Sequence, residues 1–444
     1  MRSAPTIERL GRGRIGVLGF GRDGQSAIRA FRSRLGDPDL TVLVESGEAG
    51  TDLPLIHGPF DEQLQAFDVL IRSPGIPLRH PALLAARRSG VEIVNPASIW
   101  LAERGADMTV VGVTGSKGKS TTSALLAHLL RHAGSEVLLG GNIGVPLLDH
   151  LETAAEVAVV ELSSYQLADL QGRLSMGLIT RLFPEHLDWH GSEADYVACK
   201  LRLADCLDGE PLLINATDER LVAATEHLAG RVLANRPPCI HRDQDLLRLG
   251  DRVLCRREAM PIIGRHNLDN AALALEAARR LGHSADELIG GLADFHALPH
   301  RLQPIGEVDG IRWINDSIST SPYATLAALE ALEPAAAVLI VGGLDRRPDW
   351  QTVIERCREQ PLRALITLPD NGPGIGMAFR QALPELEIRS ADSMQEAVTA
   401  AAGLARRGDV VLLSPGAPSF PHYKDFEDRG RQFTAAVRAR SGGA

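Results

Sequence analysis

The sequence has little cysteine and no long apolar run. Only 5 of its 444 residues are cysteines, and none stands in a Cys-x-x-Cys pair or another metal-ligand spacing. This pattern is typical of scattered unbridged thiols in a reducing compartment. Charged residues interrupt every apolar stretch before it reaches the roughly 20 residues that a membrane-spanning helix needs. Because the N-terminus also lacks an apolar signal core, we expect a soluble cytoplasmic protein.

Long basic runs are missing as well. The formal net charge is -9, so the chain lacks the electrostatic footprint of a nucleic-acid-binding protein. Its length suffices for about two to four domains, each with its own core. The sequence contains no internal repeat, and stretches with glycine or proline lie near residues 103 and 299. We therefore predict three α/β units in series, at residues 1–102, 103–299 and 300–444.

What the sequence does contain is a phosphate-binding pattern. A β-branched apolar run at 109–113 leads into GSKGKST at residues 115–121, and a helical pattern with one apolar face follows. Glycines let backbone N–H groups approach an anion, and the helix N-terminus adds its dipole. The lysine neutralises charge, and the serine hydroxyl can ligate Mg²⁺. Val113 stands where the standard loop has glycine, but the context predicts ATP binding rather than a purely structural turn.

The first region carries a second glycine pattern. Three glycines spaced Gly-x-Gly-x-x-Gly occupy residues 19–24, and we expect a helix from Ser26. Glu45 follows about 20 residues later, where a dinucleotide-binding fold has its ribose-binding acid. An NAD enzyme is therefore an alternative hypothesis, although other nucleotide diphosphates would use the same glycines. A strand expected at 69–72 ends in a stiff turn at 73–77, on the ligand-binding edge of such a sheet.

Polar side chains of the central region stand where a metal or substrate would bind. Glu161 ends the apolar strand expected at 157–161, and a carboxylate is costly to bury there unless it is paired or binds a metal. Capping of the next helix is the structural alternative for this residue. We interpret His190 as a surface histidine. The helix expected at 193–207 carries Lys200, which composition alone describes as a side chain that reaches solvent from the helix edge.

The remaining segments repeat the strand-and-turn pattern. Two asparagines in GRHNLDN at 264–270 open an alanine-rich helix, where they can cap the helix or match the edge of adenine. Strands are expected at 310–314, 337–341 and 409–413, and each runs into a small polar turn. This alternation predicts another parallel sheet with a ligand edge. A terminal helix is expected from Phe426.

These segments together resemble a known family. The motifs are TGSKGKST, GGNIG, VVELSSYQL, PEHLDWH, GRHNLDNAALA, LPHR, WINDS, GGLDR and LLSPGAPSF with KDFEDRG. In this order, over essentially the whole chain, they resemble the Mur ligases of peptidoglycan assembly, most closely the members that add glutamate to UDP-N-acetylmuramoyl-L-alanine. The resemblance implies an α/β fold with a Rossmann-like N-terminal domain that holds UDP, a central P-loop ATPase domain and a Rossmann-like C-terminal domain.

The resemblance also implies roles for single residues. ATP binding is implied for Gly115, Ser116, Lys117, Gly118, Lys119, Ser120, Thr121, Asn267, Asn270, Arg301 and Asp316. UDP-sugar binding is implied for Arg22, Asp23, Ser73, Asn142 and Gln166, and glutamate binding for Thr320, Arg346, Ser419, Phe420 and Phe426. The implied catalytic residues are Lys119, Glu161, His186 and Lys200. Two Mg²⁺ ions would be held by Ser120, Glu161, His186 and Lys200, the lysine as a CO₂-derived carbamate that offers an anionic oxygen.

The implied reaction has two steps. The γ-phosphoryl of ATP passes to the terminal carboxylate of the UDP-muramoyl-alanine, and the amine of glutamate then attacks the acyl phosphate. The protein would mostly neutralise charge and position the reactants. The partners would be these small molecules, without nucleic acid or membrane, and we expect a monomer. Folylpolyglutamate synthase is a lesser alternative, since it shares the ATP core but normally lacks an N-terminal UDP-binding domain.

The chain departs from the family pattern around the implied glutamate site. Ile318 stands where a lysine is usual, Phe420 where leucine is frequent, and residues 181–183 replace the usual Asn-x-Thr/Ser, whereas Arg346 keeps a cation. These features resemble a variant subgroup that adds L-glutamate and leaves its inversion to a separate epimerase. We therefore expect L-glutamate as the substrate, with D-glutamate as the alternative.

Overall fold

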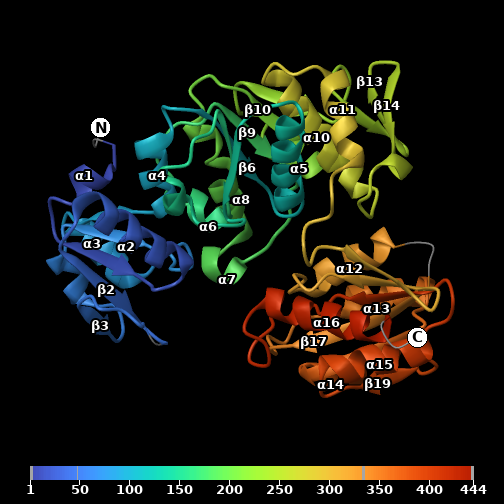
Figure 1. The fold of residues 1–444 in the computed structure, drawn as a ribbon. Helices are drawn as coiled ribbons and strands as arrows, with labels where there is room; N and C mark the ends of the chain where they lie inside the picture. Colours follow the sequence, from blue (N-terminus) through green and yellow to red (C-terminus); the bar gives the residue numbers. More distant parts are fainter. Residues whose placement is uncertain (1–3, 48, 333–335, 442–444) are drawn as a thin grey trace. The chain divides into compact units, whose positions relative to one another are not determined.

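The computed structural model describes residues 4–47, 49–332 and 336–441. The chain divides into two compact units (Figure 1). The first runs to residue 259 and takes in residues 268–293, whereas the second combines residues 260–267 with the chain from 294 onward. Within the described residues, no helix has the length and apolarity needed to cross a lipid bilayer. The predicted α/β class is confirmed, because parallel strands alternate with helices in both units.

The first sheet has five parallel strands in the order β3-β2-β1-β4-β5. Its strands are β1 (Ile15–Leu18), β2 (Leu40–Val44), β3 (Leu55–His57), β4 (Val69–Arg72) and β5 (Glu92–Val94). The helical segments around it are α1 (Ile7–Leu10), α2 (Arg22–Leu35), η1 (Glu62–Ala66), α3 (Pro81–Arg88) and α4 (Pro96–Arg104). The chain order reverses between β1 and β4, so their carboxyl ends form the switch point where such sheets bind ligands.

Helix α2 begins at Arg22, so the start predicted at Ser26 is wrong. Gly21 is extended and occupies the N-cap position, and Gly24 lies inside the first turn. A Cβ added at Gly24 would lie 2.2 Å from the carbonyl oxygen of Gly19. The third glycine therefore allows the helix to pack directly on the preceding turn rather than extending a loop.

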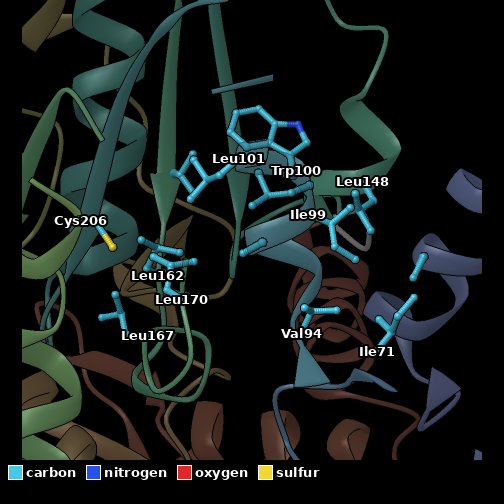
Figure 2. Packing of buried hydrophobic residues seen from close by; sticks show 14 of the residues in the cluster. Ile71, Val94, Ile99, Trp100, Leu101, Leu148, Leu162, Leu167, Leu170 and Cys206 are labelled. Carbon is cyan, nitrogen blue, oxygen red and sulfur yellow. The ribbon is translucent and has the colours of Figure 1, made fainter. Parts of the chain in front are cut away.

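One hydrophobic cluster joins the first sheet to the central region. Helix α4 contributes Ile99 and Trp100, both fully buried, and it directly precedes the first strand of the second sheet. Figure 2 shows members of this cluster, among them Ile71, Val94, Ile99, Trp100, Leu101, Leu148, Leu162, Leu167 and Leu170. The shared core explains why these two regions form a single compact unit.

The second sheet has six parallel strands in the order β11-β10-β9-β6-β8-β7. Its strands are β6 (Thr109–Thr114), β7 (Val137–Gly141), β8 (Val157–Glu161), β9 (Met176–Ile179), β10 (Leu212–Asn215) and β11 (Arg231–Ala234). The helical segments are α5 (Lys119–His132), η2 (Leu147–His150), α6 (Ser164–Leu167), α7 (Leu187–His190), α8 (Glu193–Leu201), η3 (Ala204–Cys206), α9 (Glu219–Ala224), α10 (His266–Arg280) and α11 (Ala285–Ala293). Strand β6, which precedes the phosphate loop, is central in this sheet.

Two features of this region differ from the sequence prediction. The helix expected at 193–207 ends at Leu201, and a short 3₁₀ turn follows it. The buried Leu203 turns toward the sheet, where Gly112 and Gly177 leave room for its side chain. A small antiparallel sheet, which the sequence analysis did not predict, consists of β12 (His241–Asp243), β13 (Leu246–Leu249) and β14 (Arg252–Arg256), followed by η4 (Arg257–Ala259).

The second unit contains a six-stranded sheet in the order β15-β16-β20-β17-β18-β19. Its strands are β15 (Gln303–Val308), β16 (Ile311–Asn315), β17 (Ala337–Gly343), β18 (Ala364–Asp370), β19 (Ile388–Ser390) and β20 (Val410–Leu413). Its helices are α12 (Pro322–Ala331), α13 (Gln351–Glu359), α14 (Gly372–Ala382), α15 (Met394–Leu404) and α16 (Phe426–Ser441). The predicted parallel strands are confirmed, whereas the edge strand β15 is antiparallel to β16.

Candidate active site

The phosphate loop connects β6 to α5, as its sequence predicts. Gly115 and Gly118 both have positive φ angles, of 142° and 89°. A Cβ at Gly115 would lie 2.1 Å from Thr180 Oγ1, and a Cβ at Gly118 would lie 2.5 Å from Asn270 Oδ1. Both glycines are therefore required by backbone conformation and by space, and Asn270 lies against the loop.

Side chains hold the loop from within and from its neighbours. Lys119 Nζ donates to the carbonyl oxygens of Gly115, at 2.9 Å, and Ser116, at 3.0 Å. The Ser116 hydroxyl is hydrogen-bonded to Phe183 O and lies 2.7 Å from the Tyr196 hydroxyl. Lys117 forms an ion pair with Glu185 at 3.0 Å. Ser120 is buried in the first helical turn, and Thr121 follows it half-buried, so the predicted loop residues form one preorganised cradle.

Glu161 ends β8, the strand that pairs with β6. It is 1 % exposed, and its Oε1 accepts a hydrogen bond from Asn142 Nδ2 at 2.7 Å. Its Oε2 atom has no hydrogen-bond partner among the described residues. A buried carboxylate oxygen without a donor is costly, and a bound cation would offset this cost. Glu161 does not cap α6, because Ser163 and Gln166 form that capping box.

Lys200 lies on the buried face of α8 and is 2 % exposed. Its Nζ donates to Gly115 O at 2.7 Å and to Thr114 Oγ1 at 3.2 Å, so it lies directly behind the phosphate loop. Burial, with the nearby charge of Lys119, holds the pKa of Lys200 well below its ordinary value. The composition-based interpretation of a solvent-reaching side chain is therefore wrong. One turn earlier on the same face, Tyr196 is buried as well.

His186 caps the one-turn helix α7 in a left-handed conformation, with φ of 57°. Its ring centroid lies 5.1 Å from that of Tyr165. His186 is exposed, yet the surrounding chain partly desolvates its ring, and this desolvation, together with the charges of Lys119 and Lys200, lowers the pKa of His186. The neutral imidazole is the form that ligates a metal ion. Within the described residues, no group of three or more His, Cys, Asp and Glu side chains could hold a metal ion.

His190 is buried, so its interpretation as a surface histidine is wrong. The short helix α7 places its ring between the rings of Tyr165 and Tyr196, with centroids 5.7 and 5.2 Å away. Its Nε2 lies 2.9 Å from the hydroxyl of Ser164. Burial and the neighbouring His186 lower its pKa to about 4. This ring is therefore neutral at physiological pH and supports the loop that carries His186.

The predicted UDP-sugar residues lie at and beside the switch point of the first sheet. A Cβ at Gly19 would lie 2.9 Å from Ser73 Oγ, so the turn after β1 packs closely against the turn after β4. Arg22 donates to the carbonyl oxygen of Gly144, and burial raises the pKa of the adjacent Asp23. Asn142 binds Glu161, and Gln166 caps α6. The turn that follows β7 is thus in contact with α2.

In the second unit, Asp316 is buried at the end of β16. It accepts hydrogen bonds from Leu302 N at 3.1 Å, from Ser414 Oγ at 2.9 Å and from Ser319 Oγ. Burial outweighs these donors and the nearby Arg301, and raises the pKa of Asp316 to about 6.

Asn267 Nδ2 donates to Ile263 O at 2.7 Å.

Replacing Asp316 with asparagine is expected to stabilise the second unit. The pKa of Asp316 rises from 3.8 to about 6 on folding, so ionisation of the buried carboxyl lowers stability as pH rises through this window. Asp316→Asn removes that cost, and the free energy of unfolding should rise by up to roughly 3 kcal/mol at pH 8. Urea denaturation should show that the difference in the free energy of unfolding between the variant and the native chain becomes smaller toward pH 5. An Asp316→Asn variant that is less stable than the native chain at both pH values would contradict the raised pKa of Asp316.

The predicted glutamate residues lie at one edge of the six-stranded sheet of the second unit. Arg346 follows β17, Ser419 and Phe420 follow β20, Thr320 precedes α12, and Phe426 begins α16. The loops after β17 and β20 are tied together by a hydrogen bond from Leu344 N to Pro418 O at 3.0 Å. Thr320 and Arg346 are exposed, Ser419 is buried, and Phe420 is 56 % exposed. The edge thus offers an accessible cation and ring beside buried polar groups.

The sequence analysis missed two buried arginines. Arg429 on α16 donates to Ser317 O, at 2.8 Å, and to Ala417 O, at 3.0 Å, and burial lowers its pKa to about 10. Arg72, at the end of β4, forms an ion pair with Asp169. Each arginine fixes the loops that follow strand ends, rather than binding a ligand. Only the position of Arg429 within KDFEDRG, and of Arg72 directly before the turn at 73–77, could have indicated such a role.

A P-loop at the end of a central parallel strand, with a buried carboxylate ending the adjacent strand, defines a nucleotide-binding α/β enzyme. Residues 113–236 match the Mur ligase middle domain, and residues 300–416 match the Mur ligase glutamate ligase domain. The UDP-N-acetylmuramoyl-L-alanine--L-glutamate ligase of Xylella fastidiosa is 39 % identical over 440 residues, which cover 95 % of this chain and 94 % of that protein. The chain belongs to the Mur ligase family.

A second relative agrees with this assignment, and a solved structure shares the fold. The protein of the same name from Micromonospora is 38 % identical over 453 residues, which cover 97 % of this chain and 98 % of that protein. The solved structure of MurF ligase from Thermotoga maritima in complex with ADP has a TM-score of 0.61 at 17 % identity, covering 99 % of this chain and all (100 %) of that one. At this identity the solved structure supports the shared fold alone.

Proposed function

We propose that this Mur ligase uses ATP to join L-glutamate to the alanine carboxylate of UDP-N-acetylmuramoyl-L-alanine, with release of ADP and phosphate, in cytoplasmic peptidoglycan precursor synthesis. The observation that carries the proposal is the cluster of Lys119, Glu161 and Lys200 around the phosphate loop. Relatives that are 38 and 39 % identical over nearly the whole chain bear this activity in their names, which supports L-glutamate over D-glutamate.

The phosphate loop residues 115–121 would bind the phosphates of ATP, with Asn270 against the loop. Asn267 and Asn270 would approach the adenine, and Arg301 and Asp316 would contact the nucleotide from the C-terminal domain. We propose domain limits at residues 1–102, 103–299 and 300–444. The enzyme would act as a monomer on small molecules, without nucleic acid or membrane.

Within the described residues, the partnerless carboxylate oxygen of Glu161 fits a bound cation, and we assign two Mg²⁺ ions to this site. Ser120 offers a hydroxyl and Glu161 a carboxylate oxygen without another partner among the described residues, so they would hold the first ion. His186, whose lowered pKa favours the neutral ring, would hold the second with Lys200 as a carbamate. The metal ions would neutralise the phosphate and carboxylate charges that must meet before a bond changes. The lowered pKa of Lys200 favours the neutral amine, which is the form that adds to CO₂.

The UDP-sugar and glutamate would each bind next to these groups. Arg22, Asp23, Ser73, Asn142 and Gln166 would hold the UDP-sugar so that its carboxylate faces the phosphate loop. Thr320, Arg346, Ser419, Phe420 and Phe426 would hold glutamate, the arginine by binding a carboxylate. Lys119 would stabilise the charge on the transferred phosphoryl group. Ile318 in place of the usual lysine would shape the pocket for the L-enantiomer.

An oxygen-label experiment tests the proposed route. With UDP-N-acetylmuramoyl-L-alanine labelled by ¹⁸O at both carboxylate oxygens, the oxygen that attacks the γ-phosphorus leaves with inorganic phosphate when glutamate displaces it. Mass spectrometry should therefore find one ¹⁸O in each released phosphate and one in the new amide. Unlabelled phosphate accompanied by peptide product would contradict an acyl phosphate route.

A further inference from the structure

Arg72 is the last residue of β4, and its side chain is completely buried, with 0 % exposed. A fully buried guanidinium needs an acceptor for each of its N–H groups. Arg72 obtains them from two segments that are remote in sequence, the turn at 73–76 and the stretch at 165–169. Both segments contain residues of the proposed UDP-sugar site.

One side of the guanidinium holds the turn after β4. Its Nη1 donates to the carbonyl oxygens of Ser73, Pro74 and Ile76, at 3.3, 3.0 and 2.6 Å. Three carbonyls around one nitrogen fix the backbone of this turn, which begins with Ser73 at the switch point of the first sheet. The position of Ser73 against Gly19 therefore depends on the Arg72 side chain.

The other side of the guanidinium holds the segment that carries Gln166. Nη2 donates to Tyr165 O at 2.9 Å, and Nε and Nη2 form a bidentate pair with Asp169 at 3.0 and 2.7 Å. Asn95 Nδ2 also donates to Asp169, at 2.6 Å, and to Gln166 O, at 3.1 Å. Arg72, Asp169 and Asn95 thus form one buried polar cluster that clamps the backbone on both sides of Gln166.

The same turn is also held by the loop of His186. Trp189 Nε1 donates to Gly75 O at 3.0 Å, and the Arg72 guanidinium lies over the Trp189 ring at 5.9 Å. Arg79 Nε donates to Trp189 O at 2.9 Å. The turn after β4 is therefore fixed between the buried cluster and the loop that carries His186.

We propose that Arg72 is a positioning residue for the nucleotide-sugar substrate. It holds Ser73 and Gln166 at a fixed separation. Two residues that follow strands of different sheets can therefore bind one ligand. The inference rests on the proposed function, because it takes the UDP-sugar as that ligand. Lysine cannot replace arginine here, since an ammonium group cannot donate a bidentate pair to Asp169 and also bind carbonyls on both segments.

The test compares Arg72→Lys with the matched variant Arg29→Lys. Arg29 also links α2 of the first region to η2 of the central region, through Asp149 at 2.7 Å, but its side chain is 56 % exposed and contacts neither clamped segment. For Arg72→Lys, kcat/KM for UDP-N-acetylmuramoyl-L-alanine should fall by on the order of 10²-fold, mainly through KM. KM for ATP should change less than about twofold. Arg29→Lys should leave kcat/KM and KM for the UDP-sugar, and KM for ATP, near the values of the native enzyme.

Equal losses in both variants, or equal rises in KM for both substrates, would overturn the inference in favour of a general structural role. So would a folded Arg72→Lys enzyme with an unchanged KM for the UDP-sugar. If Arg72→Lys does not fold, Trp189→Phe decides, because it keeps an aromatic ring beside Arg72 and removes the hydrogen bond to Gly75. A rise of about fivefold in KM for the UDP-sugar supports the inference, and no rise overturns it. The proposed function is tested separately with the native enzyme. If the unmodified chain does not ligate glutamate, the proposed function itself is wrong.

Discussion

Lys119→Ala should lower kcat/KM for ATP by about 10³-fold or more. The Lys119 ammonium lies over the phosphate loop, where it binds Gly115 O and Ser116 O, and ATP would replace these acceptors with phosphate oxygens. Without it, the transferred phosphoryl group would lose the cation that we assign to it. Alanine is a strong helix former, so α5 should stay intact. The measurement is phosphate release under saturating UDP-sugar and glutamate.

The control for this prediction is Lys117→Ala, two residues earlier in the same loop. Lys117 is paired with Glu185, so its removal takes a cation from the loop without emptying the position over the phosphates. We expect a loss of about tenfold or less for Lys117→Ala. Similar losses in both variants, or an active Lys119→Ala enzyme, would contradict the role of Lys119.

Lys200→Ala should be nearly inactive and should regain part of its activity with formate or acetate. The substitution removes the amine behind Gly115 and leaves a buried space of roughly the size of a small carboxylate. A carboxylate in that space would supply the anionic oxygen that we assign to the carbamate. Phosphate release should therefore rise with formate concentration and saturate.

Lys200→Met is the matched variant, because methionine fills the space with apolar atoms and leaves no room for an added anion. It should be inactive with and without formate. ¹³C NMR with labelled CO₂ gives a readout besides activity, and a carbamate signal should be present in the native chain and absent in both variants. A fully active Lys200→Ala enzyme, or equal rescue of both variants, would contradict the assignment.

The sequence predicted those parts of the structure that depend on local pattern. The strand, glycine loop and helix at 109–132 and the parallel strands of the last region were recoverable, because apolar periodicity and glycine spacing report backbone structure directly. The start of α2 was not recoverable, because Gly24 serves close packing against Gly19 rather than a turn. The antiparallel β12–β14 sheet was missed, since its short strands carry mixed charge and only partial burial.

Burial of polar side chains was the larger gap. Lys200 and His190 were interpreted as solvent-facing because charged and titratable residues usually are, yet both are buried in the structure. What holds them there is contact with segments far away in sequence, namely the phosphate loop for Lys200 and Ser164 for His190. The family resemblance implied a functional role for Lys200 without giving its environment, and it implied none for Arg72.

A ligation assay that couples phosphate release to product mass tests the proposed reaction most directly. The native chain is supplied with UDP-N-acetylmuramoyl-L-alanine, ATP, Mg²⁺ and either L- or D-glutamate. We expect phosphate release and a product heavier by one glutamyl residue with L-glutamate, and neither with D-glutamate. Turnover with D-glutamate alone would contradict the assigned stereochemistry, and no turnover with either enantiomer would contradict the proposed function itself.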